Sequence, residues 1–176
     1  FGSIGGQDFF VGRVWTDSSF DFPFFVPDSV RLEKAANFID VGNRSNVHPA
    51  SKQPVGKRLA AWAMSSVYSR DVIESGPLFE SCTRVGSSMD VVFSFVGKGL
   101  KSVDGKRIVH FEVAGEDGRF YPADAEIKHN RVRLSHEKVP RPVDARYAWL
   151  PFPDPPVNLV NSVGYPASPF TTQKEF

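Results

Sequence analysis

A series of short strand-like runs, each closed by Gly, Asp or Asn, fills the chain after residue 77 and constrains its fold most strongly. Apolar and polar residues alternate within these runs, as in half-buried strands. The dipeptide His129-Asn130 predicts a two-residue hairpin turn, since the asparagine is able to take a positive φ. Almost no helical period accompanies the runs, so we predict an antiparallel β-sandwich. The predicted strands are residues 78–85, 89–96, 108–114, 126–128, 131–135 and 143–149.

Before residue 76 the pattern is helical. Apolar residues recur at spacings of three and four, which predicts an amphipathic helix from Pro54 to about Ser69, with Pro54 in its first turn. Lys57 and Arg58 fall near the polar side, where we expect a solvated face. The expected core-facing positions are Val55, Leu59, Trp62, Ala63 and Val67.

The turn-forming residues Ser75-Gly76-Pro77 place a domain boundary near Gly76. Residues 35–41, with a weaker candidate at 22–26, predict buried strands, and residues 1–35 are otherwise hard to assign. One strand and one helix are too few for a complete α/β sheet, which implies missing strands or a second chain. The predicted class is therefore α+β, mainly β, with an incomplete α/β segment at 1–76 and a sandwich at 77–176. The Pro-rich tail from Pro151 is expected to wrap the surface.

The composition excludes several classes of protein. The 176 residues carry 21 Lys+Arg against 20 Asp+Glu, a formal net charge of +1, which argues against a partner held by phosphate charge. The single cysteine, Cys82, excludes an internal disulfide and a cysteine-based zinc cluster. No apolar run approaches the length needed to span a bilayer. Because the chain begins at Phe1 without a signal-peptide pattern, we expect it to be a piece of a longer product.

His48 is the first candidate for chemistry. It lies in a loop between the predicted strand and the helix, and Pro49 restricts its backbone to extended conformations. The loop follows the carboxyl end of a strand, where open α/β sheets gather their ligands. An imidazole held there suits general-base activation of a serine. The alternative is an exposed loop histidine without a chemical role.

A set of separated motifs, in matching order over roughly residues 36–172, resembles the C-terminal part of the sialate O-acetylesterase family. These enzymes are serine carbohydrate esterases of the SGNH-hydrolase type. The motifs are Asp40-Val41-Gly42, Val47-His48-Pro49, Lys52-Gln53-Pro54-Val55-Gly56, Arg58-Leu59-Ala60, Ser75-Gly76-Pro77-Leu78-Phe79, Val96-Gly97-x-Gly99-Leu100, Phe111-x-Val113-Ala114-Gly115-x-Asp117, Ala123-x-Ala125-x-Ile127, Val143-x-x-Arg146-Tyr147-Ala148-Trp149, Asn158-Leu159 and Pro166-Ala167-Ser168-Pro169-Phe170.

The resemblance implies hydrolysis of acetyl esters on sugar hydroxyls through an acyl-enzyme, with an acetylated carbohydrate such as a sialic acid as partner and without a cofactor, metal or nucleic acid. It implies that His48 is the general base, and a secreted, periplasmic or lysosomal location. Relatives in the wider superfamily often carry an aspartate three residues before the histidine, but here that position holds Ser45. Asp40 is the nearest upstream carboxylate and is therefore the candidate partner of the histidine. The family's Gly-Gln-Ser-Asn-like nucleophile block has no counterpart in this sequence. The nearest string, Gly5-Gly6-Gln7-Asp8, has Asp8 in place of the serine, and we interpret the similarity as chance. We therefore expect this chain alone to be inactive, its hydrolase portion lying elsewhere.

The remaining candidates have simpler structural readings. His110, His129 and His136 are read as structural or solvated, and Ser3 lacks the context of a nucleophile elbow. Arg146, Tyr147 and Trp149 suit either a sugar platform or the sandwich core, and we favour the core. A second hypothesis is accordingly a non-catalytic carbohydrate-binding or structural module.

Overall fold

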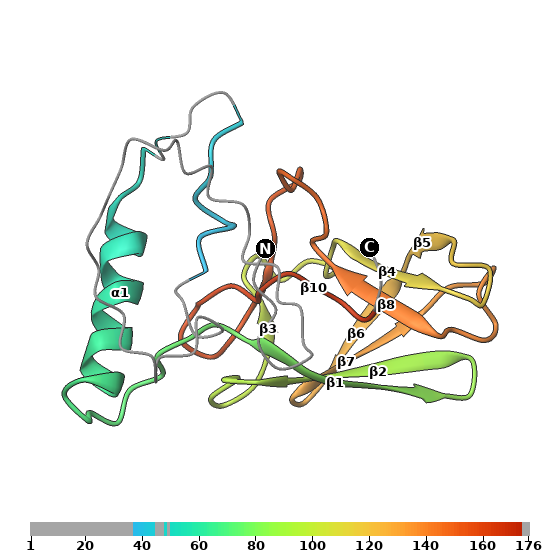
Figure 1. The fold of residues 1–176 in the computed structure, drawn as a ribbon, viewed down its shortest axis with the longest axis horizontal. Coiled ribbons are helices and arrows are strands. Elements are labelled where there is room, and N and C mark those ends of the chain that lie inside the picture. Colours follow the sequence, from blue (N-terminus) through green and yellow to red (C-terminus); the bar gives the residue numbers. More distant parts are fainter. Residues whose placement is uncertain (1–36, 45–47, 49, 174–176) are drawn as a thin grey trace.

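The computed structural model describes residues 37–44, 48 and 50–173, and in them one helix accompanies three antiparallel sheets. The arrangement is sandwich-like (Figure 1), which confirms the predicted mainly β fold. The first sheet has the order β1 (Leu78–Val85), β2 (Ser88–Ser94), β7 (Arg131–Ser135), β6 (Asp124–Lys128). The second has the order β10 (Phe170–Thr171), β8 (Asp144–Tyr147), β4 (Phe111–Ala114), β5 (Phe120–Pro122). The third pairs β3 (Lys101–Ser102) with β9 (Leu159–Val160).

The core lies between the two larger sheets because alternate residues of each strand point inward. Aromatic rings fill this core: across the two sheets the Phe93 and Phe111 centroids lie 6.4 Å apart in an edge arrangement, and within the second sheet those of Phe111 and Tyr147 lie 4.5 Å apart. Burial of Tyr147 confirms its predicted place in the core. On the opposite side of the first sheet, Arg133 donates hydrogen bonds of 2.7 and 2.8 Å to Asp90, so that face is polar.

The local hairpins follow the prediction closely. β1 and β7 have the predicted bounds, and β2, β4, β6 and β8 fall at the predicted places with shifted ends. The predicted turn between β6 and β7 is also present, and its positive φ of 59° belongs to His129 rather than to Asn130. A positive φ at the first turn residue alone is the pattern of a type II′ connection.

The C-terminal tail differs from the prediction. It was expected to wrap the surface, yet it supplies β9 and β10 and buries Leu159, Ala167 and Phe170. The Phe170 ring stacks on Phe79 with centroids 4.5 Å apart. Proline removes only its own N–H, so the non-proline residues between the prolines remain able to pair in the sheets. Strands of two residues carry no periodic signal, which explains why the pattern missed them.

The segment before the helix also departs from the prediction. The described part of the expected strand at 35–41 is a turn, because the Asn37 Oδ1 accepts a hydrogen bond from the Ile39 N–H at 3.1 Å. The Phe38 carbonyl accepts a second one from the Val41 N–H, also at 3.1 Å. Asparagine side chains compete in this way with regular backbone pairing. The predicted strand at 22–26 lies outside the described residues.

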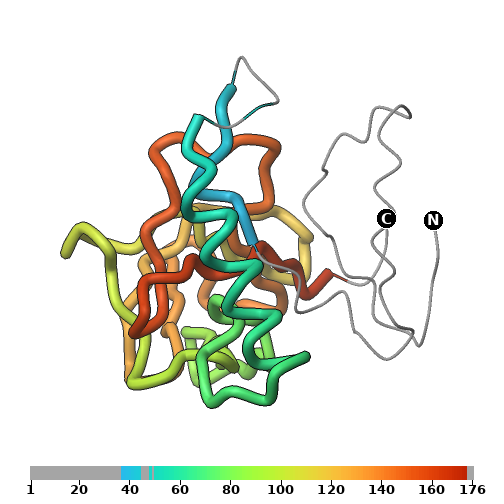
Figure 2. The backbone as a smooth tube through the Cα atoms, turned by 90° about the vertical axis from the view of Figure 1, so that its left-hand side faces the viewer, coloured from blue at the N-terminus to red at the C-terminus, as the bar shows by residue number. Residues whose placement is uncertain are grey.

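Helix α1 (Gln53–Ser66) begins near the predicted residue, with a proline in its first turn, and ends three residues early. Figures 1 and 2 show it lying across one end of the sandwich. Its predicted orientation was wrong in part: Leu59 is 48% and Val67 66% exposed, whereas Arg58 is only 6% exposed. The polar partners of Arg58, described below, account for this inversion. Among the described residues, no helix is long and apolar enough to cross a membrane.

Candidate active site

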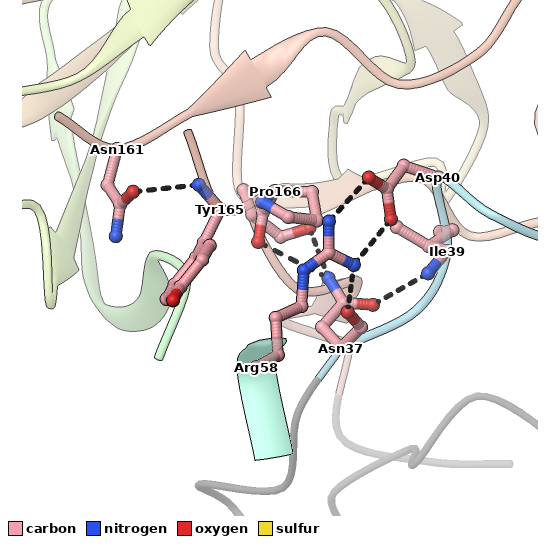
Figure 3. Close-up of polar contacts among 8 residues, drawn as sticks. Asn37, Ile39, Asp40, Arg58, Asn161, Tyr165 and Pro166 are labelled. Carbon is pink, nitrogen blue, oxygen red and sulfur yellow. Dashed lines mark hydrogen bonds and ion pairs between the residues drawn. The ribbon is translucent and has the colours of Figure 1, made fainter. Parts of the chain in front are cut away.

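The Arg58 guanidinium joins helix α1 to the turn that precedes it (Figure 3). Its Nη1 donates hydrogen bonds of 2.7 Å to the Asn37 carbonyl and to the Asp40 Oδ1. Its Nη2 donates a third, of 2.6 Å, to the Asp40 Oδ2. The side chains of Arg58 and Asp40 are 7% and 28% exposed. A paired, two-pronged contact of this kind fixes orientation as well as distance.

Arg58, Asp40 and Asn37 form a hydrogen-bonded group, the Arg58 joint, and Asn37 connects it to the sandwich. Its Nδ2 donates to the Ala167 carbonyl at 2.9 Å and, at a longer 3.4 Å, to the Pro166 carbonyl. The Tyr165 ring lies beside the guanidinium, with its centroid 5.9 Å from the Arg58 Cζ, within cation–π range. Residues 37–40, helix α1 and residues 165–167 therefore meet at one point.

Asn161 holds the sandwich side of this junction, and sequence reasoning missed it. The side chain is fully buried; its Nδ2 donates to the carbonyls of Ser75 and Phe95, both at 2.9 Å. Its Oδ1 accepts from the N–H groups of Tyr165 and Val163 at 2.9 and 3.2 Å. An asparagine directly after the apolar pair Leu159-Val160 was the available signal, since a polar residue in a buried run needs a full set of partners.

His48 is exposed. In sequence it lies eight residues after Asp40 and ten before Arg58. Arg44, on the same connection, is 3.4 Å from Asp154 and lies over the Phe152 ring at 5.4 Å, both in the C-terminal tail. Described residues on either side of His48 are thus attached to the same end of the sandwich.

The structure places Asp40, the predicted carboxylate partner, against Arg58. Both of its oxygens accept hydrogen bonds from that guanidinium. A carboxylate whose charge is already balanced stabilises a neighbouring imidazolium less than an unpaired one does. Its pairing with His48 stays a prediction, whereas its part in the Arg58 joint is observed.

The other histidines have structural surroundings. The His110 Nε2 contacts the Pro155 carbonyl, and His129 occupies the exposed hairpin turn. The His136 Nδ1 accepts from the Lys138 N–H at 3.1 Å, and its ring stacks on Tyr121. In the part of the chain that the structure describes, no cluster of three His, Cys, Asp or Glu side chains could hold a metal ion.

By sequence, Arg146 and Trp149 suit either a sugar platform or the sandwich core. Arg146 donates to both Glu112 oxygens, at 2.7 and 3.0 Å, and lies over the Phe120 ring at 4.0 Å. These contacts join β8, β4 and β5, so they account for Arg146 as a cross-strand residue of the sheet. Trp149 is partly buried.

Comparison with known proteins finds similarity among solved structures. No family model and no curated protein matches the sequence. The crystal structure of XAC1771, described as a novel carbohydrate acetylesterase from Xanthomonas citri, matches with a TM-score of 0.74 and 36% sequence identity. The match covers 78% of this chain but 32% of that protein, so the chain spans about a third of the length of its relative. Over most of its own length, the chain is related to a carbohydrate acetylesterase.

Proposed function

We propose that this chain is the C-terminal part of a carbohydrate O-acetylesterase of the sialate O-acetylesterase type, with His48 as its general base. The observation that carries the proposal is the 36% identity to a carbohydrate acetylesterase over 78% of the chain. The exposure of His48, on a connection attached to the sandwich on both sides, is consistent with this role.

In the proposed reaction a serine Oγ attacks the acetyl carbonyl carbon while the His48 imidazole takes the hydroxyl proton. The tetrahedral intermediate then collapses, the sugar oxygen leaves with that proton, and an acetyl-serine remains. Water, deprotonated by the same imidazole, attacks the acyl carbon, and acetate leaves as the proton returns to the serine. Asp40 is proposed as the carboxylate partner of the His48 imidazole, and its observed hydrogen bonds with Arg58 fix the turn that precedes the histidine.

The serine is proposed to lie in a hydrolase portion beyond this chain, which makes the chain inactive alone. Two thirds of the relative has no counterpart here. Helix α1 and its C-cap present apolar side chains outward: Leu59 and Met64 in the helix and Val67 at the cap are exposed by 48%, 42% and 66%. Burial of such a face against the remaining hydrolase portion would stabilise a helix that is too short to be stable by itself. We accordingly propose that residues 1–76 belong to the hydrolase domain and 77–176 form an accessory sandwich.

A second candidate function is sugar binding without catalysis. The observation that favours it is a depression of about 510 Å³ whose lining is mostly polar. Charged and hydroxyl side chains there offer hydrogen-bond partners to sugar hydroxyls. The lining residues are Ser88, Arg107, Asp124, Ala125, Glu126, Arg133 and Ser135.

The test is acetate release from an O-acetylated sialic acid by the product of the whole reading frame that encodes this chain. We expect turnover, with kcat lowered about 10²- to 10⁴-fold by His48→Ala, the contribution typical of a general base. His129→Asn is the matched control, because His129 is exposed, lies in the distant hairpin turn and has a positive φ that asparagine tolerates. Turnover that survives His48→Ala would exclude the assignment. Sugar binding without turnover would favour the second candidate.

A further inference from the structure

We infer that Arg58 is a positioning residue for His48: it holds the chain segments before and after the histidine at one point on the sandwich. The inference rests on the proposed role of His48. Its evidence, the geometry of the guanidinium, is independent of that role.

One side chain, that of Arg58, connects the segment before His48 to the helix after it. Arg58 belongs to α1, after the histidine, and its three hydrogen bonds go to Asn37 and Asp40, before it. Fixing the two ends of a connection removes much of the conformational freedom between them. The described anchors at 40 and 58 thus restrict where residue 48 can lie.

The second step is that the joint is itself fixed to the core-bearing sandwich. The Asn37 side chain donates to the Ala167 carbonyl, and Ile39, next along the turn, packs against the hydrophobic core. On the other side Asn161 holds the backbone of Tyr165, whose ring faces the guanidinium. The two segments that flank His48, at 37–40 and at Arg58, are therefore both attached to the sandwich.

The third step is that the geometry is specific to arginine. Arg58 uses both terminal nitrogens at once, one on each Asp40 oxygen, with the Asn37 carbonyl as a third acceptor. A lysine keeps the charge but offers a single point in place of the planar fork. Arg58→Lys should therefore retain part of the joint, whereas Arg58→Met keeps side-chain bulk and loses every hydrogen bond.

The experiment combines amide hydrogen exchange with the NMR signal of the His48 ring, and neither measurement needs catalysis. For Arg58→Met we expect exchange across 37–44 to quicken at least about tenfold and the His48 ring shift to move toward that of an unstructured histidine. Exchange in β2 and β7 should not change, and Arg58→Lys should fall between. Lys57→Met is the matched control, because Lys57 is exposed on the same helix, outside the joint.

Two results would overturn the inference. One is an unchanged His48 signal and unchanged exchange at 37–44 in Arg58→Met. The other is faster exchange in β2 and β7 equal to that at 37–44, which would make Arg58 a contributor to global stability alone.

In the product of the whole reading frame, Arg58→Met should lower kcat about 10- to 100-fold at unchanged KM, as expected for a misplaced catalytic group, with partial rescue by Arg58→Lys. An unchanged kcat in Arg58→Met would contradict the inference. Absence of turnover in the unsubstituted protein would refute the proposed function, while the exchange result would still decide the role of Arg58.

Discussion

Asn161 and Arg58 are buried polar side chains that join segments far apart in the sequence. Asn161 fills all four of its hydrogen-bonding positions with backbone groups of Ser75, Phe95, Val163 and Tyr165. A fully satisfied buried amide specifies one arrangement of its neighbours, because any other arrangement leaves polar groups unpaired. These two side chains therefore fix the end of the sandwich to which the turn at 37–40 is attached.

Replacing Asn161 by alanine should lower the free energy of unfolding by about 3–5 kcal/mol, since two buried carbonyls and two N–H groups lose their partner together. Urea unfolding followed by circular dichroism measures the change. Asn130→Ala is the control: this asparagine is exposed in the hairpin turn, and its removal should cost no more than about 0.5 kcal/mol. A loss below about 1 kcal/mol for Asn161→Ala would mean that water replaces the amide at little cost.

At the scale of elements, local patterns predicted what local interactions determine. The strands β1 and β7 and the helix start were predictable because alternation and proline placement act within a few residues. The strands β9 and β10 were not, because two-residue strands exist only through pairing with distant partners. The orientation of α1 was mispredicted for the same reason: its buried residue is set by Asp40, 18 residues away.

His48 shows how much of the candidate site could be predicted from the sequence. Its place in a loop followed by Pro49 was readable from the sequence, and the structure shows it exposed. The Arg58 joint that flanks it was not readable, since a helical pattern assigns a charged residue to solvent unless its partner is known. Bidentate pairing with a turn carboxylate is a tertiary property.

Two glycines should respond oppositely to alanine. At Gly76 a Cβ would lie 2.0 Å from the Pro166 carbonyl oxygen, a backbone atom, so Gly76→Ala should destabilise the protein by about 3 kcal/mol. At Gly56, exposed in α1, a Cβ meets nothing within 4 Å, and Gly56→Ala should stabilise by about 0.5–1 kcal/mol. Thermal unfolding of both variants gives the signs. A neutral Gly76→Ala would show that the approach of residues 75–77 to the tail is looser than described.

At the scale of the whole molecule, the two parts of the chain differ in how they bury apolar surface. Among the residues that the structure describes, every member of the buried hydrophobic core lies between Met89 and Phe170. From the first part, Ile39 packs against this core, while Leu59 and Met64 of α1 and its C-cap residue Val67 are exposed. Among the described residues the sandwich thus contains its own core, which is consistent with the proposed domain division near Gly76.

A fragment of residues 72–176 tests this division, since it keeps the Ser75 and Pro77 carbonyls that pair with Asn161 and Ser168. We expect cooperative urea unfolding and a preserved near-ultraviolet circular dichroism signal from the packed rings. The free energy of unfolding should fall by about 1–2 kcal/mol, because the fragment loses the apolar contact of Ile39. A fragment without fixed aromatic packing would instead show that the turn at 37–40 and the Arg58 joint belong to the folding unit. The domain boundary would then lie before Asn37, and the segments flanking His48 would be part of the sandwich itself.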